Sequence, residues 1–292
     1  MSSRRARLLA LAACALWAGA TRGGEPGDAA IARGDAAWER RAEGHEGSRG
    51  AIPPIAAAIA AYDEALAAAP ESGEARWKIM RALFFHGEYV AVDRDEQLAI
   101  FERGRLLGEA GIDAIAARVG GRERLWKATA DDLRAAVPDP TEAAEILFWS
   151  AAHTGVWGRT RGKLASARQG VAGRIRDYAA ASMKLDPEIE NGGGHRVLGR
   201  LHTEAPKIPF ITGWIDRETA IAQLEACFAI APHDLTTRLY LGEALAEFVP
   251  QRKEEGLRML RELVTVTPNP EWLVEELKAI ADARAVLLRL AS

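Results

Sequence analysis

The segment AIAAYDEALAAAP, residues 58–70, contains the spacing that decides the fold of this 292-residue chain. Ala58 is followed after four positions by Tyr62, after three more by Ala65 and after five more by Pro70. Residues three, four and seven positions apart lie on one face of an α-helix, and a small residue on that face lets a neighbouring helix approach closely. Because proline stops a helix, the segment predicts the second helix of a helical hairpin.

The same spacing recurs further along the chain. It is found in AIAQLEACFAIAP, residues 220–232, in GLRMLRELVTVTP, residues 256–268, and in degenerate form from Ile175 to Pro187. These segments resemble the second helix of the tetratricopeptide repeat, and repetition of this kind is typical of helical arrays. The resemblance implies an all-α fold, a superhelical array of antiparallel helix hairpins with a concave groove. The alternative is an irregular helical domain whose helices end in proline.

The rest of the sequence also favours helices. Beyond residue 20, no stretch alternates apolar and polar positions for long enough to predict a strand. Helices are expected at 28–44, 54–69, 73–87, 94–118, 122–136, 140–154, 161–184, 194–204, 216–231, 235–248, 252–266 and 270–289. We therefore expect one helical-repeat domain over residues 21–292, with the hairpins clearest at 54–90 and 214–290.

The N-terminus has the pattern of a secretory signal peptide. Three arginines precede an apolar run at residues 8–17, and Ala18-Gly19-Ala20 supplies the small residues of a cleavage site. This predicts a signal peptide over residues 1–20 and location in the periplasm or cell envelope. The segment Leu11-Ala12-Ala13-Cys14 has the form of a lipobox, so lipid anchoring through Cys14 is the alternative. Cleavage after Ala20 would leave Cys227 as the last cysteine and no intramolecular disulfide.

A glycine-rich stretch near residue 194 is the part of the chain that least resembles a repeat. Three glycines allow positive φ angles and close backbone approach, and a helix that starts at Gly194 would point free amides outward. Such a site could bind an anion, although glycine runs usually mark turns. The candidate binding residues here are Asn191, Gly193, Gly194, His195 and Arg196.

Aromatic residues form a second candidate site. Trp149, Trp157 and Trp214 lie near predicted helix ends or loops, and Phe210 lies close to Trp214 in a proline-rich loop. If they gather in space they would line an apolar ligand cleft, whereas the alternative is that they belong to the core.

A basic run, residues 159–176, is the third candidate. It contains Arg159 and Arg161, and no acidic residue interrupts it before Asp177. It could dock an acidic partner or an anionic ligand, although such runs are often simply solvated helix faces. The formal net charge of −3 argues against a nucleic acid as partner.

Catalytic and metal-binding patterns were not found. His195 and His202 are about 10.5 Å apart along a helix, too far to share one ion. His153 and His233 are isolated histidines near predicted helix ends, and no nucleophile lies beside a base in a strained glycine-framed turn. We therefore expect a protein that is not an enzyme and that carries no metal and no cofactor.

The chain resembles the T component of tetratricopeptide-associated TRAP transporters over residues 140–250. The resemblance includes the stretch GGGHRVLG at 192–199, the proline-rich loop after it and Gly213. The resemblance implies a periplasmic, often lipid-anchored homotrimer with an apolar ligand cleft, which partners a periplasmic solute-binding protein. The weak lipobox departs from that family's pattern. The helix pair near Leu198-Gly199-Arg200 is also similar to the regulator-of-microtubule-dynamics family. We expect an accessory binding protein for solute uptake, which takes a small apolar or anionic ligand; the alternative is a general envelope scaffold.

Overall fold

The computed structural model of the chain describes residues 27–162 and 169–291. In these two stretches it has thirteen α-helices and no strand, which confirms the all-α class. The predicted signal peptide, residues 1–20 with Cys14, lies outside the described residues.

The helices follow one another with short connections. Their bounds are α1 (Asp28–Glu39), α2 (Ile52–Ala68), α3 (Gly73–Phe85), α4 (Arg94–Val119), α5 (Arg122–Lys127), α6 (Ala130–Ala136), α7 (Pro140–Arg161), α9 (Val171–Leu185), α10 (Ile189–Glu204), α11 (Arg217–Ile230), α12 (Leu235–Phe248), α13 (Lys253–Leu263) and α14 (Leu273–Ala291). A π-helical turn, η1 (His86–Val90), extends α3, and the 3-10 turns η2 (Pro250–Arg252) and η3 (Pro270–Trp272) precede α13 and α14.

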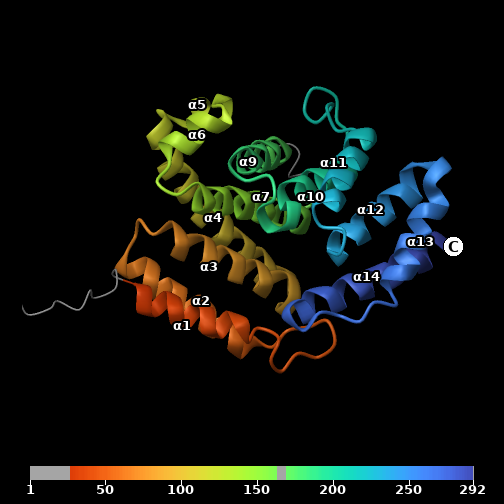
Figure 1. Cartoon of the computed structure of the whole chain (residues 1–292), viewed down its shortest axis with the longest axis horizontal. Helices are drawn as coiled ribbons and strands as arrows, with labels where there is room; N and C mark the ends of the chain where they lie inside the picture. The colour runs from red at the N-terminus through yellow and green to blue at the C-terminus, as the bar shows by residue number, and fades with distance from the viewer. Residues whose placement is uncertain (1–26, 163–168, 292) are drawn as a thin grey trace, which may run out of the picture.

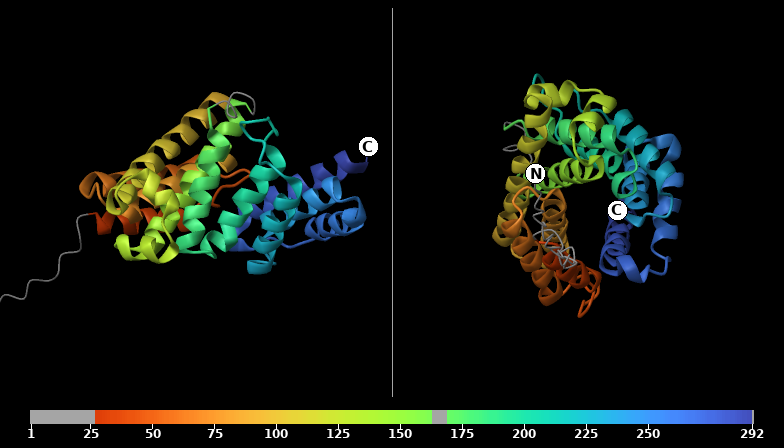
Figure 2. Two further views of the ribbon diagram at one scale, coloured as in Figure 1. Left: turned by 90° about the horizontal axis from the view of Figure 1, so that it is seen from above. Right: turned by 60° about the vertical axis from the view of Figure 1, so that its left-hand side comes forward.

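Most helices pack against the next helix in the chain. The pairs α1 with α2, α7 with α9, α10 with α11 and α12 with α13 are among the most extensive contacts, and α4 packs on α7 (Figure 1). The views in Figure 2 show the helices following a curved path, so that α14 comes back toward the N-terminal helices. The main core lies between α4, α7, α9 and α10.

The small residues of the repeated spacing lie at helix–helix contacts, as predicted. Ala58 and Ala220 are fully buried. A Cβ on Gly256 would lie 2.4 Å from the carbonyl oxygen of Gly242, so α13 crosses α12 almost backbone to backbone. Close packing at this position requires glycine because any side chain would overlap the neighbouring helix.

Several predicted helix bounds were wrong. The helix expected at 122–136 is divided into α5 and α6, because Thr129 forms a capping box that starts a new helix. Of the helix expected at 161–184, Arg161 belongs to the end of α7, residues 163–168 lie outside the described residues, and α9 begins at Val171, directly after Gly170 in a left-handed conformation. The first helix ends at Glu39, five residues before the predicted end. Asp139 caps α7 as expected, since its side chain accepts hydrogen bonds from the backbone amides of Thr141 and Glu142.

The two ends of the helical path are joined by direct contacts. Val274 of α14 is fully buried in the core cluster of the N-terminal hairpins, together with Ala37 and Phe85. Arg41, just after α1, donates to the carboxylate of Glu275 at 2.8 Å. These contacts close the curved path of helices around a central space.

Candidate functional site

A cavity of about 650 Å³ lies in the centre of the molecule. It is lined by residues from α1, α3, α7, α9, α10, α11, α12 and α14 and from the turns and loops that join the helices. Its volume falls within the range of pockets that bind small organic ligands. The cavity depends on the closure described above, since residues near both ends of the chain contribute to its lining.

Apolar side chains from the middle of the chain cover a large part of the cavity. They come mainly from α7, α9 and α10, with Phe84 from α3: Phe84, Phe148, Trp149, Ala152, Val156, Val171, Ile175, Val197 and Leu201. Phe84 and Trp149 are in contact, with ring centroids 5.4 Å apart. This lining can bury the apolar body of a ligand.

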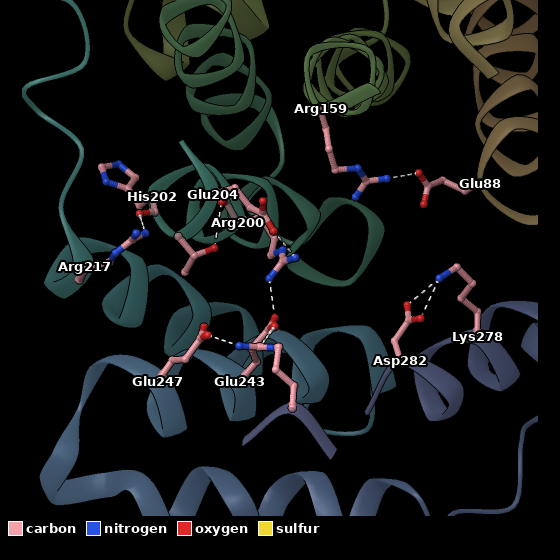
Figure 3. A network of polar contacts seen from close by, with 12 residues as sticks. Glu88, Arg159, Arg200, His202, Glu204, Arg217, Glu243, Glu247, Lys278 and Asp282 are labelled. Atoms are coloured by element: carbon pink, nitrogen blue, oxygen red, sulfur yellow. Dashed lines mark hydrogen bonds and ion pairs between the residues drawn. The ribbon is translucent and has the colours of Figure 1, made fainter. Parts of the chain in front are cut away.

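Charged and polar side chains cover the rest. They include Arg81, Glu88, Tyr89, Arg159, Glu190, Arg196, Arg200, Glu204, Asp234, Tyr240 and Glu275. Figure 3 shows Arg159 of α7 extended toward Glu88, with which it forms an ion pair. Arg200 forms ion pairs with Glu204 at 2.6 Å and with Glu243 at 2.8 Å (Figure 3). The cavity is therefore amphipathic.

At one end of the cavity, aromatic rings and arginines alternate in a stack. The guanidinium of Arg81 lies 4.9 Å from the ring of Trp77 and 4.1 Å from that of Trp38. Arg41 continues the stack, 4.5 Å from Trp38 and 5.0 Å from Trp272. Cation–π contacts of this kind favour partly desolvated arginines, so the stack helps to hold the two ends of the chain together.

A strained backbone segment lies on the cavity wall at the start of α10. Glu190 and Asn191 have φ angles of 47° and 59°, and Gly192 follows at 74°. Residues other than glycine rarely adopt this left-handed conformation, and the strain persists only where the surroundings impose it. Arg196 supplies part of that constraint, since it donates to the carbonyl oxygen of Glu190 at 3.1 Å and to the hydroxyl of Thr237 at 3.3 Å.

Two carboxyl groups near this segment have raised pKa values. Burial, together with the nearby Glu190 carboxyl, raises the pKa of Glu145 to about 8, against the lowering effect of Arg81. Burial also raises the pKa of Glu190, although Arg81 and Arg196 lower it. The indole of Trp149 donates to Glu145 at 3.0 Å, which links this carboxyl to the aromatic lining of the cavity.

The structure brings four of the sequence-predicted site residues to the cavity. They are Trp149, Arg159, Asn191 and Arg196. The other seven do not line it: Trp157, Arg161, Gly193, Gly194, His195, Phe210 and Trp214.

The glycines of the predicted anion site allow close helix packing instead. A Cβ on Gly193 would lie 2.4 Å from the ring of Phe148, and one on Gly194 would lie 2.4 Å from the side chain of Met183. Although α10 spans Ile189–Glu204, residues 190–192 have non-helical φ and ψ angles, so its regular part begins after Gly192, within about a residue of the predicted start at Gly194. His195 contacts the amide oxygen of Gln223 at 2.8 Å.

The predicted aromatic group is dispersed. Trp157 is buried in the main core, with Arg105 and Arg161 against its ring. Trp214 packs on His202, and Phe210 is fully exposed. The aromatic lining of the cavity therefore comes from other residues.

The remaining basic and histidine candidates also have defined positions. Arg159 lines the cavity, whereas Lys163 and Arg168 of the basic run lie outside the described residues. The prediction that His153 lies near a helix end was wrong, because it is in the interior of α7 and fully buried. Its ring contacts the carbonyl oxygen of Met80 at 2.8 Å, and burial lowers its pKa to about 4.

Sequence reasoning missed Glu190 on the cavity wall and Glu145 near it. The two residues belong to different helices, and neither stands in a recognisable motif. A weak signal was present at Glu190, which directly precedes the chain's run of Asn and Gly and so stands next to a segment prone to positive φ. Arg81 had no such signal, since it reads as an ordinary residue of an amphipathic helix.

Within residues 27–162 and 169–291, no group of three or more His, Cys, Asp or Glu side chains is placed to hold a metal ion. The helices of these stretches also include none that is both long and apolar enough to cross a membrane. No family model matches the chain, and no curated protein matches it.

Proposed function

We propose that this protein is an exported, non-catalytic binding protein that holds an organic ligand in its central cavity. The single observation that carries the proposal is a cavity of about 650 Å³ whose lining combines apolar side chains, mainly from α7, α9 and α10, with charged side chains. Such a site suits a ligand with an apolar body and one polar end.

The more specific form of the proposal is an accessory T component of a TRAP-type uptake system, built from divergent tetratricopeptide hairpins. Support comes from the resemblance over residues 140–250, from the repeated spacing and from the burial of Ala58, Ala220 and Gly256 where that spacing requires close packing. On this proposal the N-terminal twenty residues direct export, and the partner is a periplasmic solute-binding protein. The protein would work as a homo-oligomer, a trimer by the same resemblance.

Ligand binding can be tested by native mass spectrometry of protein purified from its own cell envelope, followed by solvent extraction. A small molecule should accompany the wild-type protein. It should be lost from Ala152→Trp, because Ala152 lines the cavity and the larger ring would fill it. Ala60→Trp is the matched control, because Ala60 is exposed on α2. Equal retention of the molecule by both variants would reject the cavity as the binding site.

The partner is tested separately. Affinity capture from a periplasmic extract should recover a solute-binding protein, identified by mass spectrometry. If the capture yields no solute-binding protein and the genomic neighbourhood lacks permease genes, the transport role is contradicted, whereas the proposal of ligand binding is unaffected.

The charged side of the cavity favours a second candidate, an envelope scaffold that holds peptide segments of other proteins. Arg159, Arg196 and Arg200 with Glu88 and Asp234 present alternating charge to the interior, as expected of a surface that binds extended peptides. Cross-linking in whole cells distinguishes the two. A scaffold should give several protein adducts from photoreactive residues in the cavity, whereas a ligand carrier should give few.

A further inference from the structure

The carboxyl group of Glu190 is the starting observation. Glu190 lines the cavity and is half-buried. Its backbone carbonyl accepts from Arg196, but in the described part of the chain its side chain has no hydrogen bond and no ion pair. A carboxyl group that is shielded from water normally has such a partner, because its desolvation is otherwise uncompensated.

Glu190 lies in a strained turn of the cavity wall. It is in the left-handed conformation, which is unfavourable for a residue other than glycine. Strained residues of this kind cluster at ligand-binding positions. The hydrogen bonds of Arg196 to the Glu190 carbonyl and to the Thr237 hydroxyl hold this turn in place.

The charges around Glu190 are not balanced. Arg196 is paired with Asp234 at 3.5 Å, and Arg41 is paired with Glu275 at 2.8 Å. Arg81 is the remaining guanidinium that acts on Glu190, and it acts on Glu145 as well. Asp186 adds further negative charge near Glu145. One guanidinium therefore acts on both carboxyl groups, and burial raises the pKa of each.

The surrounding rings suit a cation. Phe148 and Trp149 line the cavity with their centroids 4.9 Å apart. Both are close to the acidic pair: the ring of Phe148 and the Cβ of Glu190 are the nearest neighbours of Gly193, and Trp149 donates to Glu145. Aromatic rings beside carboxylates are the surroundings in which proteins recognise ammonium groups.

We infer that Glu190, with Glu145 behind the lining residue Trp149, forms the head-group site of the central cavity, and that this site takes an organic ligand with a protonated amine. The inference rests on the proposed function, since it names the chemical class of the ligand. In the bound state the ammonium group lies at Glu190 against Phe148 and Trp149, and the apolar body of the ligand extends along α7 and α9. The cation replaces the proton of the carboxyl pair, and this proton leaves to the solvent.

Three probes with the same apolar body and different heads test the inference: 4-phenylbutylamine, 4-phenylbutanol and 4-phenylbutyrate. Binding at neutral pH is followed by tryptophan fluorescence and by calorimetry in buffers of different ionisation enthalpy. We expect the amine to bind about tenfold or more tightly than the alcohol, with release of a proton, and the butyrate to bind least well.

Two variants with the same change in charge locate the effect. Glu190→Gln should remove the preference for the amine, a loss of about tenfold, and should abolish proton release, while the alcohol binds as before. Glu188→Gln is the matched control, because Glu188 lies two residues earlier and is exposed; it should leave all three affinities unchanged. Thermal unfolding of each variant confirms that the fold is retained.

The result that overturns the inference is equal binding of amine and alcohol, tighter binding of butyrate, or an amine preference that survives Glu190→Gln. Binding of the alcohol in any of these cases leaves the proposed cavity function standing. Failure of all three probes to bind overturns the inference, whereas failure of the proposed function is recognised by its own test, retention of the native ligand by Ala152→Trp.

Discussion

The side chains of Arg41 and Glu275, 234 positions apart in the chain, are joined by a hydrogen bond of 2.8 Å from Nε to Oε1. Arg41 is 4% exposed and also donates to the carbonyl oxygen of Glu271 at 2.5 Å. The rings of Trp38 and Trp272 lie against its guanidinium. One buried side chain thus connects the first helix to the last and closes the helical path around the cavity.

Replacing Arg41 should open this closure. In Arg41→Met the carboxylate of Glu275 would be left largely buried without its partner, a loss of about 3 kcal/mol in the free energy of unfolding. Amide hydrogen exchange should accelerate in α1 and α14 and remain unchanged in α7. Arg33→Met is the control, because the Arg33–Glu64 pair is exposed and should contribute less than about 1 kcal/mol. Unchanged exchange in α14 would show that apolar contacts such as that of Val274 suffice.

Gly104 should not tolerate alanine. A Cβ at this position would lie 2.2 Å from Cε1 of the buried His153 ring, so α4 and α7 would have to move apart. We expect Gly104→Ala to lower the free energy of unfolding by about 2 kcal/mol, despite the better helix propensity of alanine. Gly173→Ala on α9 is the matched control, because nothing lies within 4 Å of its added methyl group. Urea denaturation should show that the control variant gains about 0.5–1 kcal/mol in the free energy of unfolding.

The raised pKa of Glu145, about 8 in the folded protein, predicts a loss of stability at alkaline pH. A carboxyl with a raised folded-state pKa binds more protons in the folded than in the unfolded state between the two pKa values. Stability from this group is therefore complete below the unfolded pKa of about 4.3 and falls as the pH rises toward 8.

Glu145→Gln should remove that dependence. Chemical denaturation from pH 5 to pH 8 should show the wild type losing about 1 kcal/mol or more relative to the variant. His153 has the opposite effect, since its lowered pKa makes the folded protein lose stability as the pH falls from about 6.5 toward 4. Both proteins share this histidine, so it cancels in the difference. Parallel pH profiles would contradict the assignment.

The left-handed turn at 190–192 should depend on the guanidinium of Arg196. Lysine keeps the charge opposite Asp234 but cannot bond the carbonyl of Glu190 and the hydroxyl of Thr237 at once. We expect Arg196→Lys to lower the free energy of unfolding by about 1–2 kcal/mol and to accelerate hydrogen exchange at 189–192. Arg238→Lys, whose partner Glu262 is mostly exposed, should change neither.

Local packing of helix faces could be predicted from the sequence, whereas the positions of the site residues could not. The apolar spacing at Ala58, Tyr62 and Ala65 predicted a packed helix face, and all three side chains are buried. The break at Thr129 was missed because its capping box competes with a pattern that continues on both sides. Among the tryptophans predicted to form the site, Trp149 lines the cavity whereas Trp157 and Trp214 do not, although all three had similar signals in the sequence.

The sequence by itself determined that the chain is helical, where most of its helices lie, and which small residues let them pack closely. These features are readable because helix periodicity and helix termination act over a few neighbouring residues. Only the tertiary structure decided that Arg41 meets Glu275, that the helices enclose a cavity and that Glu190 lines it. Those outcomes depend on small angles between successive helices, which add up over the whole chain and leave no local pattern in the residues that finally meet.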